Sequence, residues 1–250
     1  MHKNFYCATL ASTVSLILKN IRVDLPGLKW AVREISFTAT AGEVFTLCGP
    51  SGSGKTTILR TVAGLISSQE GDILLKETSI IATPIKDRNI FLLQLDFALH
   101  SNKTAYQNLY LGLRYQKTPK HEIKEKIMQA SQKAGVDEIL YTKVKRLTPI
   151  QKLQISLMRL CLRRIDLILV DDPFLSFNPQ DTKAALGLLV KTAQQLNVPL
   201  VYSTIDSSHV AHLNVKTAIL KEGTIVAIDH VHNLTQSPPT DYVKNILMDS

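Results

Sequence analysis

The sequence predicts an α/β fold in which helices pack against a mixed or parallel sheet. Nine short apolar segments have the length and composition of β-strands, and helical patterns separate several of them. A glycine-rich segment also joins one predicted strand to a predicted helix. The predicted strands comprise residues 16–23, 34–39, 44–48, 72–75, 90–94, 167–171, 200–203, 217–220 and 224–227.

The glycine-rich segment has the full spacing of a phosphate-binding P-loop, Gly-x4-Gly-Lys-Thr, between apolar residues 44–48 and helical residues 58–63. Glycines let backbone N–H groups point into one concavity, and the next helix adds partial positive charge. This complete match disfavours an ordinary Gly/Ser turn. We predict that a nucleoside triphosphate is bound by Gly49, Pro50, Ser51, Gly52, Ser53, Gly54, Lys55, Thr56 and Thr57.

The chain is long and apolar enough to bury a large core. It has 250 residues, of which 45% are hydrophobic, which suits one large domain or two closely joined subdomains. No apolar window reaches the length needed to cross a bilayer, so we expect a soluble or peripheral protein. Residues 5–18 are fairly apolar but interrupted by polar residues, and we expect a strand at 15–23 rather than a cleaved signal.

Cysteine usage and charge limit the possible partners. Cys7, Cys48 and Cys161 are widely spaced, which predicts reduced, buried thiols rather than a disulfide framework or a metal site. The net charge of +8 comes from scattered lysines and arginines without interleaved aromatics. We therefore expect no nucleic-acid partner, and an anionic membrane leaflet explains the charge equally well.

Residues 104–164 change to an almost entirely helical pattern. Within them, Pro119 to Gly135 carries apolar residues at Ile123, Ile127 and Ala130 with charges between, which predicts a surface helix with one buried face. A helical insertion therefore interrupts the succession of strands.

The order of these motifs resembles that of ABC-type ATPases, in which a P-loop is followed by an isolated glutamine, a helical block and an apolar strand ending in acidic residues. Residues 167–171 resemble the Walker B strand, whose final carboxylate, here Asp171, holds Mg²⁺ through water. Gln94 resembles the Q-loop glutamine, which senses the γ-phosphate and the membrane partner, although a solvent-facing strand end is the simpler alternative.

The resemblance covers nearly the whole chain. Residues 98–113 and the tail 223–246 resemble in particular the nucleotide-binding subunits of importers. It implies a P-loop NTPase sheet core at about 14–94 and 165–250, an N-terminal antiparallel β subdomain, and a helical subdomain at about 95–164. It implies ATP and Mg²⁺ as cofactors, with Thr56, Gln94 and Asp171 at the metal. Transmembrane permease subunits and a second nucleotide-binding subunit are the implied partners, and the implied location is peripheral, at the cytoplasmic face of the inner or plasma membrane.

The first departure from the family lies at its signature, normally Leu-Ser-Gly-Gly-Gln. Ungapped counting from the Walker B strand places Leu147-Thr148-Pro149-Ile150-Gln151 there. In the family, backbone N–H groups of the signature close on the γ-phosphate that the other subunit holds. Pro149 has no N–H to offer, and the branched side chain of Ile150 stands where close backbone approach is required. Each lost charge-assisted hydrogen bond removes roughly 1.5–3 kcal/mol from the free energy of this closure. The same residues predict a capped helix start, with Thr148 as N-cap, Pro149 at the first position and Gln151 completing a capping box.

The resemblance implies Gln94 and Asp172 as catalytic residues, yet further departures predict slow hydrolysis. Asp172 occupies the position of the catalytic glutamate and is one methylene shorter, and a misplacement of about 1 Å costs on the order of 100-fold. Ile205 stands in place of the switch histidine, and Asn178 in place of a coupling aspartate.

Nearby residues offer no clear replacement. His209 and His212 have i, i+3 spacing, which favours surface histidines over switch or metal ligands. The adenine-stacking aromatic would fall near Leu25 or Pro26, and Trp30, the nearest aromatic, suits a core position better.

Three functions follow from these observations. The first is the ATP-binding subunit of an ABC-type importer with slow or absent hydrolysis. The alternative is a scaffold or regulatory partner of a transporter that binds nucleotide without consuming it. A soluble nucleic-acid-associated ABC ATPase is disfavoured, because the long coiled-coil or zinc insertions of such proteins are missing from the sequence.

Overall fold

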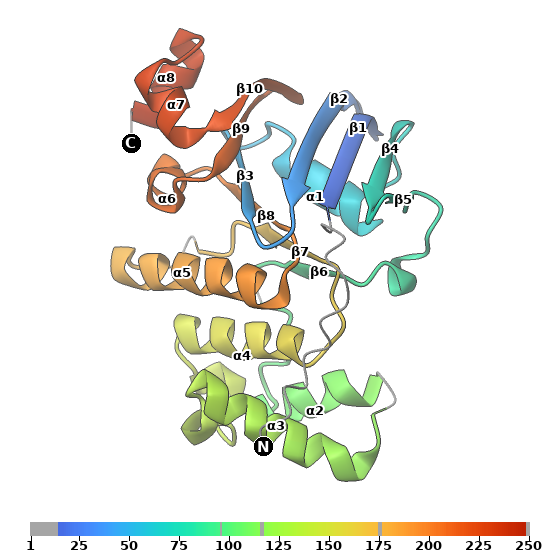
Figure 1. Ribbon diagram of the computed structural model, residues 1–250, viewed down its shortest axis with the longest axis vertical. Helices are drawn as coiled ribbons and strands as arrows, with labels where there is room; N and C mark the ends of the chain where they lie inside the picture. Colours follow the sequence, from blue (N-terminus) through green and yellow to red (C-terminus); the bar gives the residue numbers. More distant parts are fainter. Residues whose placement is uncertain (1–14, 96, 116–117, 175–176, 249–250) are drawn as a thin grey trace, which may run out of the picture.

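The computed structural model describes residues 15–95, 97–115, 118–174 and 177–248, apart from the side chains of residues 28–30. These residues form two sheets with helices around them, and a separate group of helices at one end (Figure 1). Cys7 and the side chain of Trp30 therefore lie outside the described residues.

The smaller sheet is antiparallel and has the strand order β2-β1-β4-β5. Its strands are β1 (Ser15–Leu25), β2 (Leu28–Thr40), β4 (Glu70–Leu75) and the two-residue β5 (Thr78–Ser79), which the sequence did not predict. This arrangement confirms the expected N-terminal antiparallel unit.

The larger sheet has the order β10-β9-β3-β8-β7-β6, with β10 antiparallel to β9 and the other neighbours parallel. Its strands are β3 (Val44–Cys48), β6 (Ile90–Leu93), β7 (Leu167–Asp171), β8 (Leu200–Thr204), β9 (Lys216–Lys221) and β10 (Thr224–His230). Because the parallel strands β3, β7 and β8 end at one edge, the residues that follow them are brought together there.

Helices cover both faces of the larger sheet. Helix α1 (Lys55–Ala63) lies between the two sheets, and its Ile58, Leu59 and Val62 share one apolar core with strands of both. Helix α5 (Pro179–Leu196) packs on the other face, where Leu186 and Leu189 are buried. The last helices are α6 (Ser207–Leu213), α7 (Val231–Gln236) and α8 (Asp241–Met248).

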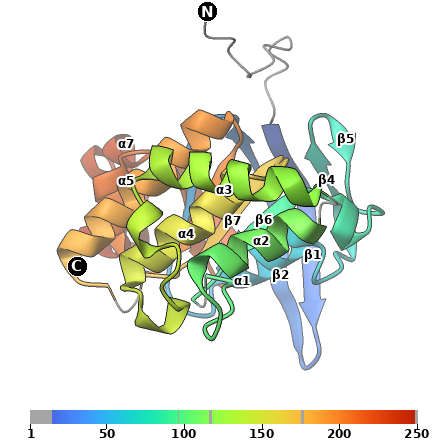
Figure 2. The same cartoon turned by 90° about the horizontal axis from the view of Figure 1, so that it is seen from below.

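The helical end is built by α2 (Ala105–Tyr115), α3 (Lys120–Ala134) and α4 (Pro149–Cys161), seen from below in Figure 2. These helices enclose an apolar cluster of their own. Ile123 and Ile127 of α3 are fully buried and Ala130 is partly buried, so the predicted one-sided surface helix is confirmed.

The predicted start of α4 is also confirmed. The Thr148 hydroxyl accepts a hydrogen bond of 3.3 Å from the Gln151 N–H, and the Thr148 N–H donates one of 2.9 Å to Gln151 Oε1. Pro149 occupies the first turn of the helix, where its missing N–H removes no helical hydrogen bond. The sequence Thr-Pro-Ile-Gln is therefore a complete helix start.

The cysteine expectation is half right. Cys48 is fully buried at the end of β3, but Cys161, the last residue of α4, is exposed, because the helix ends at solvent there. Within the described ranges, no helix is both long and apolar enough to span a membrane.

Candidate nucleotide site

The turn from β3 into α1 can be built only with glycine at two positions. Gly49 has φ +155° and Gly54 has φ +102°. A Cβ on Gly49 would lie 2.5 Å from the Leu220 carbonyl oxygen, and one on Gly54 would lie 2.9 Å from that of Ala31. The loop is therefore packed backbone to backbone against β9 and β2, which holds its N–H groups in a fixed concavity.

A cavity of about 300 Å³ opens over this loop. Of the predicted loop residues, Ser51, Gly52, Gly54, Lys55, Thr56 and Thr57 line it, whereas Gly49, Pro50 and Ser53 do not. The remaining wall residues come from distant segments of the chain, namely Leu25, Ala31, Asp171, Asp172, Ser203 and Ile205.

Lys55 is buried and folded back on the loop that precedes it. Its Nζ donates hydrogen bonds to the carbonyl oxygens of Gly49 at 2.6 Å and Pro50 at 2.8 Å. Burial lowers the pKa of Lys55, although the carboxylates of Asp171 and Asp172 act in the opposite direction. The lysine is thus held in the cavity wall by neutral oxygens that an anionic ligand can replace.

Thr56, Asp171 and Ser203 form one polar cluster. Oδ1 of Asp171 accepts hydrogen bonds from the Thr56 hydroxyl at 2.9 Å and from the Ser203 hydroxyl at 3.0 Å. A carboxylate and a hydroxyl beside a phosphate cradle are oxygen donors of the kind Mg²⁺ uses, because Mg²⁺ is held by one or two carboxylates together with substrate phosphates. These residues therefore fit a metal bound with the nucleotide.

The structure does not bring Gln94 into this cluster. It follows β6, which pairs with β7 through Leu93 and Val170, and it is absent from the residues that line the cavity. The predicted strand 90–94 ends one residue earlier, at Leu93. The backbone turns there, since the Phe97 N–H donates to the Gln94 carbonyl oxygen at 2.9 Å.

Asp172 lies in the cavity wall in a strained conformation. Its φ is +38°, a left-handed value that non-glycine residues seldom adopt. Oδ2 accepts a hydrogen bond of 3.3 Å from the Ile205 N–H, while Oδ1 is buried without a hydrogen-bond partner. Burial raises the pKa of Asp172, and the Ile205 N–H works against this rise.

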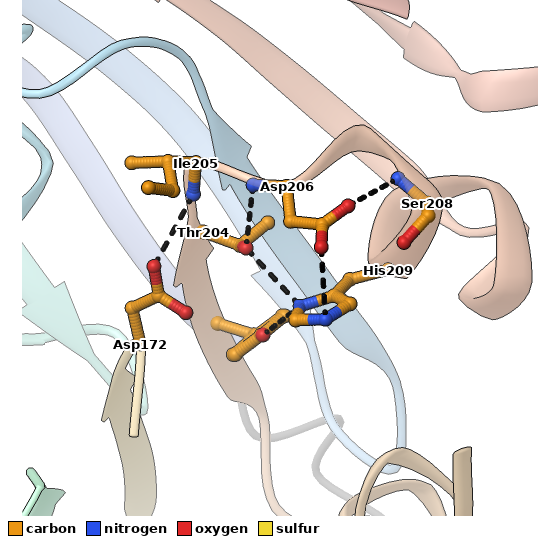
Figure 3. Close-up of polar contacts among 7 residues, drawn as sticks. Asp172, Thr204, Ile205, Asp206, Ser208 and His209 are labelled. Atoms are coloured by element: carbon orange, nitrogen blue, oxygen red, sulfur yellow. Dashed lines mark hydrogen bonds and ion pairs between the residues drawn. The ribbon is translucent and has the colours of Figure 1, made fainter. Parts of the chain in front are cut away.

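The segment after β8 is organised by His209, which is only 8% exposed. Its Nδ1 lies 2.7 Å from the Tyr202 hydroxyl and 3.2 Å from that of Thr204, and its Nε2 lies 3.4 Å from Asp206 Oδ2 (Figure 3). The expectation of a surface histidine is therefore wrong for His209, because α6 turns this side chain toward β8. His212 is exposed, as expected.

The family comparison shows which family this site belongs to. The family described as ABC transporter matches residues 32–175, which is more than half of the chain. The chain is an ABC transporter ATP-binding domain. Similar proteins include the molybdate/tungstate import ATP-binding protein WtpC of Pyrococcus horikoshii, 27% identical over 88% of this chain and 64% of that protein. The putative 2-aminoethylphosphonate import ATP-binding protein PhnT of Salmonella choleraesuis is 30% identical over 94% of this chain and 64% of that protein.

Solved structures agree with this ABC domain assignment at the level of the fold. CbiO1 from Clostridium perfringens, part of the ABC transporter complex cbiONQ, superposes with a TM-score of 0.82. The match covers 95% of this chain and 97% of that chain at 19% sequence identity. The predicted α/β architecture is confirmed. The chain spans about 64% of the length of the curated relatives named above.

Two of the altered positions in this ABC domain have local structural roles. Thr148 caps α4, and neither it nor Pro149 or Ile150 lines the cavity of this single chain. Asn178 caps α5, where its Oδ1 accepts a hydrogen bond of 2.8 Å from the Asp181 N–H. Ile205 does line the cavity and is 52% exposed, so an apolar side chain occupies this part of the wall.

Sequence reasoning missed Ser203 and the role of His209. The apolar run 200–203 predicts only a strand that ends at Ser203, and the contact of Ser203 with Asp171 follows from the pairing of β7 with β8. The sequence did contain a signal for His209. Asp206 is a residue type that favours the N-cap of a helix, which places His209 in the first turn of the helix that follows Thr204. Leu25, one of the residues expected near the base, does line the cavity.

Proposed function

We propose that this ABC domain is the ATP-binding subunit of a membrane importer and that it hydrolyses ATP slowly or not at all. The proposal that the chain binds Mg-ATP is supported by the hydrogen bonds of Thr56 and Ser203 to Oδ1 of Asp171, beside an intact P-loop. The apolar side chain of Ile205 in the cavity wall supports slow hydrolysis, because isoleucine can neither donate a hydrogen bond to a phosphate nor orient a water.

Mg²⁺ is proposed to bind with the nucleotide, held by Thr56 and Asp171. Gln94, which lies outside this cluster and the cavity lining, is proposed as a further ligand by the family resemblance alone. The ion would neutralise phosphate charge. Lys55 would leave the loop carbonyls for the phosphates. Asp172, with one oxygen already held by the Ile205 N–H, is the proposed but short base for the attacking water.

The proposed assembly follows the importer relatives. This subunit and a second nucleotide-binding subunit, in a homodimer or a heterodimer, would associate with transmembrane permease subunits at the cytoplasmic face of the membrane. We propose a division into a nucleotide-binding core, at about 14–94 and 165–250, and a helical subdomain at about 95–164, because the helical end has an apolar cluster of its own. Identification of a membrane partner that co-purifies with the chain would test this assembly.

A non-hydrolysing scaffold is the second candidate, and the same position, Ile205, favours it. Equilibrium binding of a fluorescent ATP analogue, followed by single-turnover hydrolysis, separates the two functions, with Lys55→Ala as the blank. We expect binding that requires Lys55, and turnover far below that of a relative with an intact site. Turnover equal to that relative would contradict slow hydrolysis, and binding unaffected by Lys55→Ala would contradict the site.

A nucleic-acid-associated ATPase is not expected, and a gel shift tests this directly. Binding driven by phosphate contacts would be visible at near-physiological salt and would weaken steeply as salt is raised. We expect no shift under these conditions.

A further inference from the structure

We propose that His209 is a positioning residue for Asp172, acting through the turn formed by Thr204, Ile205 and Asp206. Its effect on the phosphate site rests on the proposed role of Asp172. The hydrogen-bond geometry itself is independent of that role.

The histidine is held on three sides. Tyr202 is fully buried, and burial raises its pKa well above the ordinary value, so its hydroxyl keeps the proton and can donate to His209 Nδ1 at 2.7 Å. With Nδ1 accepting, the proton of a neutral imidazole lies on Nε2, which faces Asp206 Oδ2 at 3.4 Å. One tautomer therefore satisfies both contacts.

The turn is closed by hydrogen bonds that share these groups. The Asp206 N–H donates to Thr204 Oγ1 at 3.0 Å, and that hydroxyl lies 3.2 Å from His209 Nδ1. The second Asp206 oxygen accepts from the Ser208 N–H at 2.8 Å and caps α6. Both ends of the turn, Thr204 and Asp206, thus pack against the same imidazole (Figure 3).

Ile205 is the residue between these two fixed points. Its side chain makes no polar contact, but its N–H is directed at Asp172 Oδ2, 3.3 Å away, on the neighbouring strand end. Since Asp172 has a left-handed backbone and a buried, unpartnered Oδ1, this N–H is the hydrogen bond that orients the carboxylate. The side chain of Ile205 cannot form a hydrogen bond to phosphate. The backbone N–H of Ile205 nevertheless positions the carboxylate of Asp172.

The wall that contains this network separates two cavities. Asp172 and Ile205 line both the phosphate cavity and a larger cavity of about 730 Å³ between α5 and α6. His209 and Asp206 line the larger cavity only. The network therefore contacts, from the side of the larger cavity, the two residues that also face the phosphate site.

The test is amide hydrogen exchange at Ile205 and Asp206, measured by NMR on the full chain without nucleotide. His209→Leu removes both ring nitrogens at similar volume, and we expect exchange at Ile205 to rise by about tenfold, as one hydrogen bond of about 1.4 kcal/mol is released. The amides of Leu169 and Val201, in the centre of the sheet, serve as internal references.

Two variants on the same helix separate positioning from general loosening. His209→Gln can still accept from Tyr202 and donate to Asp206, so exchange should stay close to that of the unmodified chain. His212→Leu alters the exposed histidine that lines the same cavity and should change nothing at Ile205. Unchanged exchange at Ile205 in His209→Leu, or an equal rise in His212→Leu, would overturn the proposal.

The link to Asp172 is tested by a double-mutant cycle. If the Ile205 N–H is held by the carboxylate, His209→Leu should cause no further rise in exchange in an Asp172→Ala background, whereas additive effects would overturn the link. If His209→Leu also speeds amide exchange at the reference residues Leu169 and Val201, Tyr202→Phe is used in its place. In that variant, the proposal requires faster exchange at Ile205 and Asp206 only. The ATP affinity of His209→Leu, measured alongside, should equal that of the unmodified chain, and absent ATP binding in the unmodified chain would contradict the proposed function alone.

Discussion

The hydroxyl of Thr56 donates a hydrogen bond of 2.9 Å to Oδ1 of Asp171, although 115 residues separate the two in the sequence. Thr56 belongs to the P-loop and is the second residue of α1, whereas Asp171 ends β7, which lies two strands from β3 in the sheet. The contact joins the phosphate cradle to the carboxylate that is proposed to hold Mg²⁺ with it.

Thr56→Val should therefore weaken the effect of Mg²⁺ on ATP affinity. Valine keeps the volume but removes the oxygen donor, so we expect the gain in affinity that Mg²⁺ gives the unmodified chain to fall by about tenfold, or about 1.4 kcal/mol. Titration of a fluorescent ATP analogue with Mg²⁺ and with EDTA measures this gain. Thr61→Val is the control, because the Thr61 hydroxyl donates within α1, to the Thr57 carbonyl oxygen at 2.8 Å. A gain preserved in Thr56→Val would show that Thr56 does not bind the ion.

Restoring the altered family residues together should revive hydrolysis. The combined variant carries Asp172→Glu, Ile205→His, Pro149→Gly and Ile150→Gly. The first two changes restore a longer base and a hydrogen-bonding side chain, and the two glycines allow the backbone to approach the γ-phosphate closely. We expect single-turnover hydrolysis to rise by at least about 100-fold, since base placement alone is worth this much. No rise in a variant that is folded and still binds ATP would show that these positions do not limit the rate.

The two glycines carry a cost that must be measured in the same experiment. Glycine in place of Pro149 and Ile150 weakens the first turn of α4 by up to about 1 kcal/mol per residue. The Asp172→Glu, Ile205→His double variant, which leaves α4 intact, is the matched control for stability. The melting temperature of this double variant should be closer to that of the original chain than the melting temperature of the quadruple variant is.

Thr148→Ala should destabilise the chain without changing ATP affinity. The substitution removes one of the two reciprocal hydrogen bonds of the capping box, which is worth about 0.5–2 kcal/mol in unfolding free energy. Chemical denaturation monitored by circular dichroism measures the loss. Thr148→Ser keeps the hydroxyl and should retain most of the stability, and equal losses in both variants would rule out the cap as the cause.

Cys48 should react with thiol reagents only after the core opens. Burial raises the pKa of this thiol to about 11, so at pH 8 the reactive thiolate is scarce in the folded chain, whereas the unfolded thiol, with an ordinary pKa, ionises readily. In a Cys7→Ser, Cys161→Ser variant, we expect alkylation at pH 8 to be slower by on the order of 100-fold when folded than when unfolded. Raising the pH through 11 should increase the native rate. Comparable rates in the two states at pH 8 would contradict the burial of Cys48.

The local structure of this chain followed from short-range patterns. Alternating or continuous apolar runs predicted the main strands, and the Thr148 and Gln151 pair predicted the cap of α4, because such hydrogen bonds join residues three apart. The two-residue β5 was missed, since it is too short to show periodicity. Cys161 was misjudged because an apolar neighbourhood in the sequence does not reveal where a helix meets solvent.

The phosphate loop could be predicted from the sequence alone, since its glycines, Lys55 and Thr56 lie within one short segment and their backbone requirements are local. The surroundings of the loop depend on how distant segments pack against it. The parallel register of β7 and β8 brings Ser203 to Asp171 and Ile205 to Asp172, and the turn into α6 buries His209 beneath them. These contacts join residues about 30 positions apart through sheet pairing, a relation that no spacing along a single segment encodes.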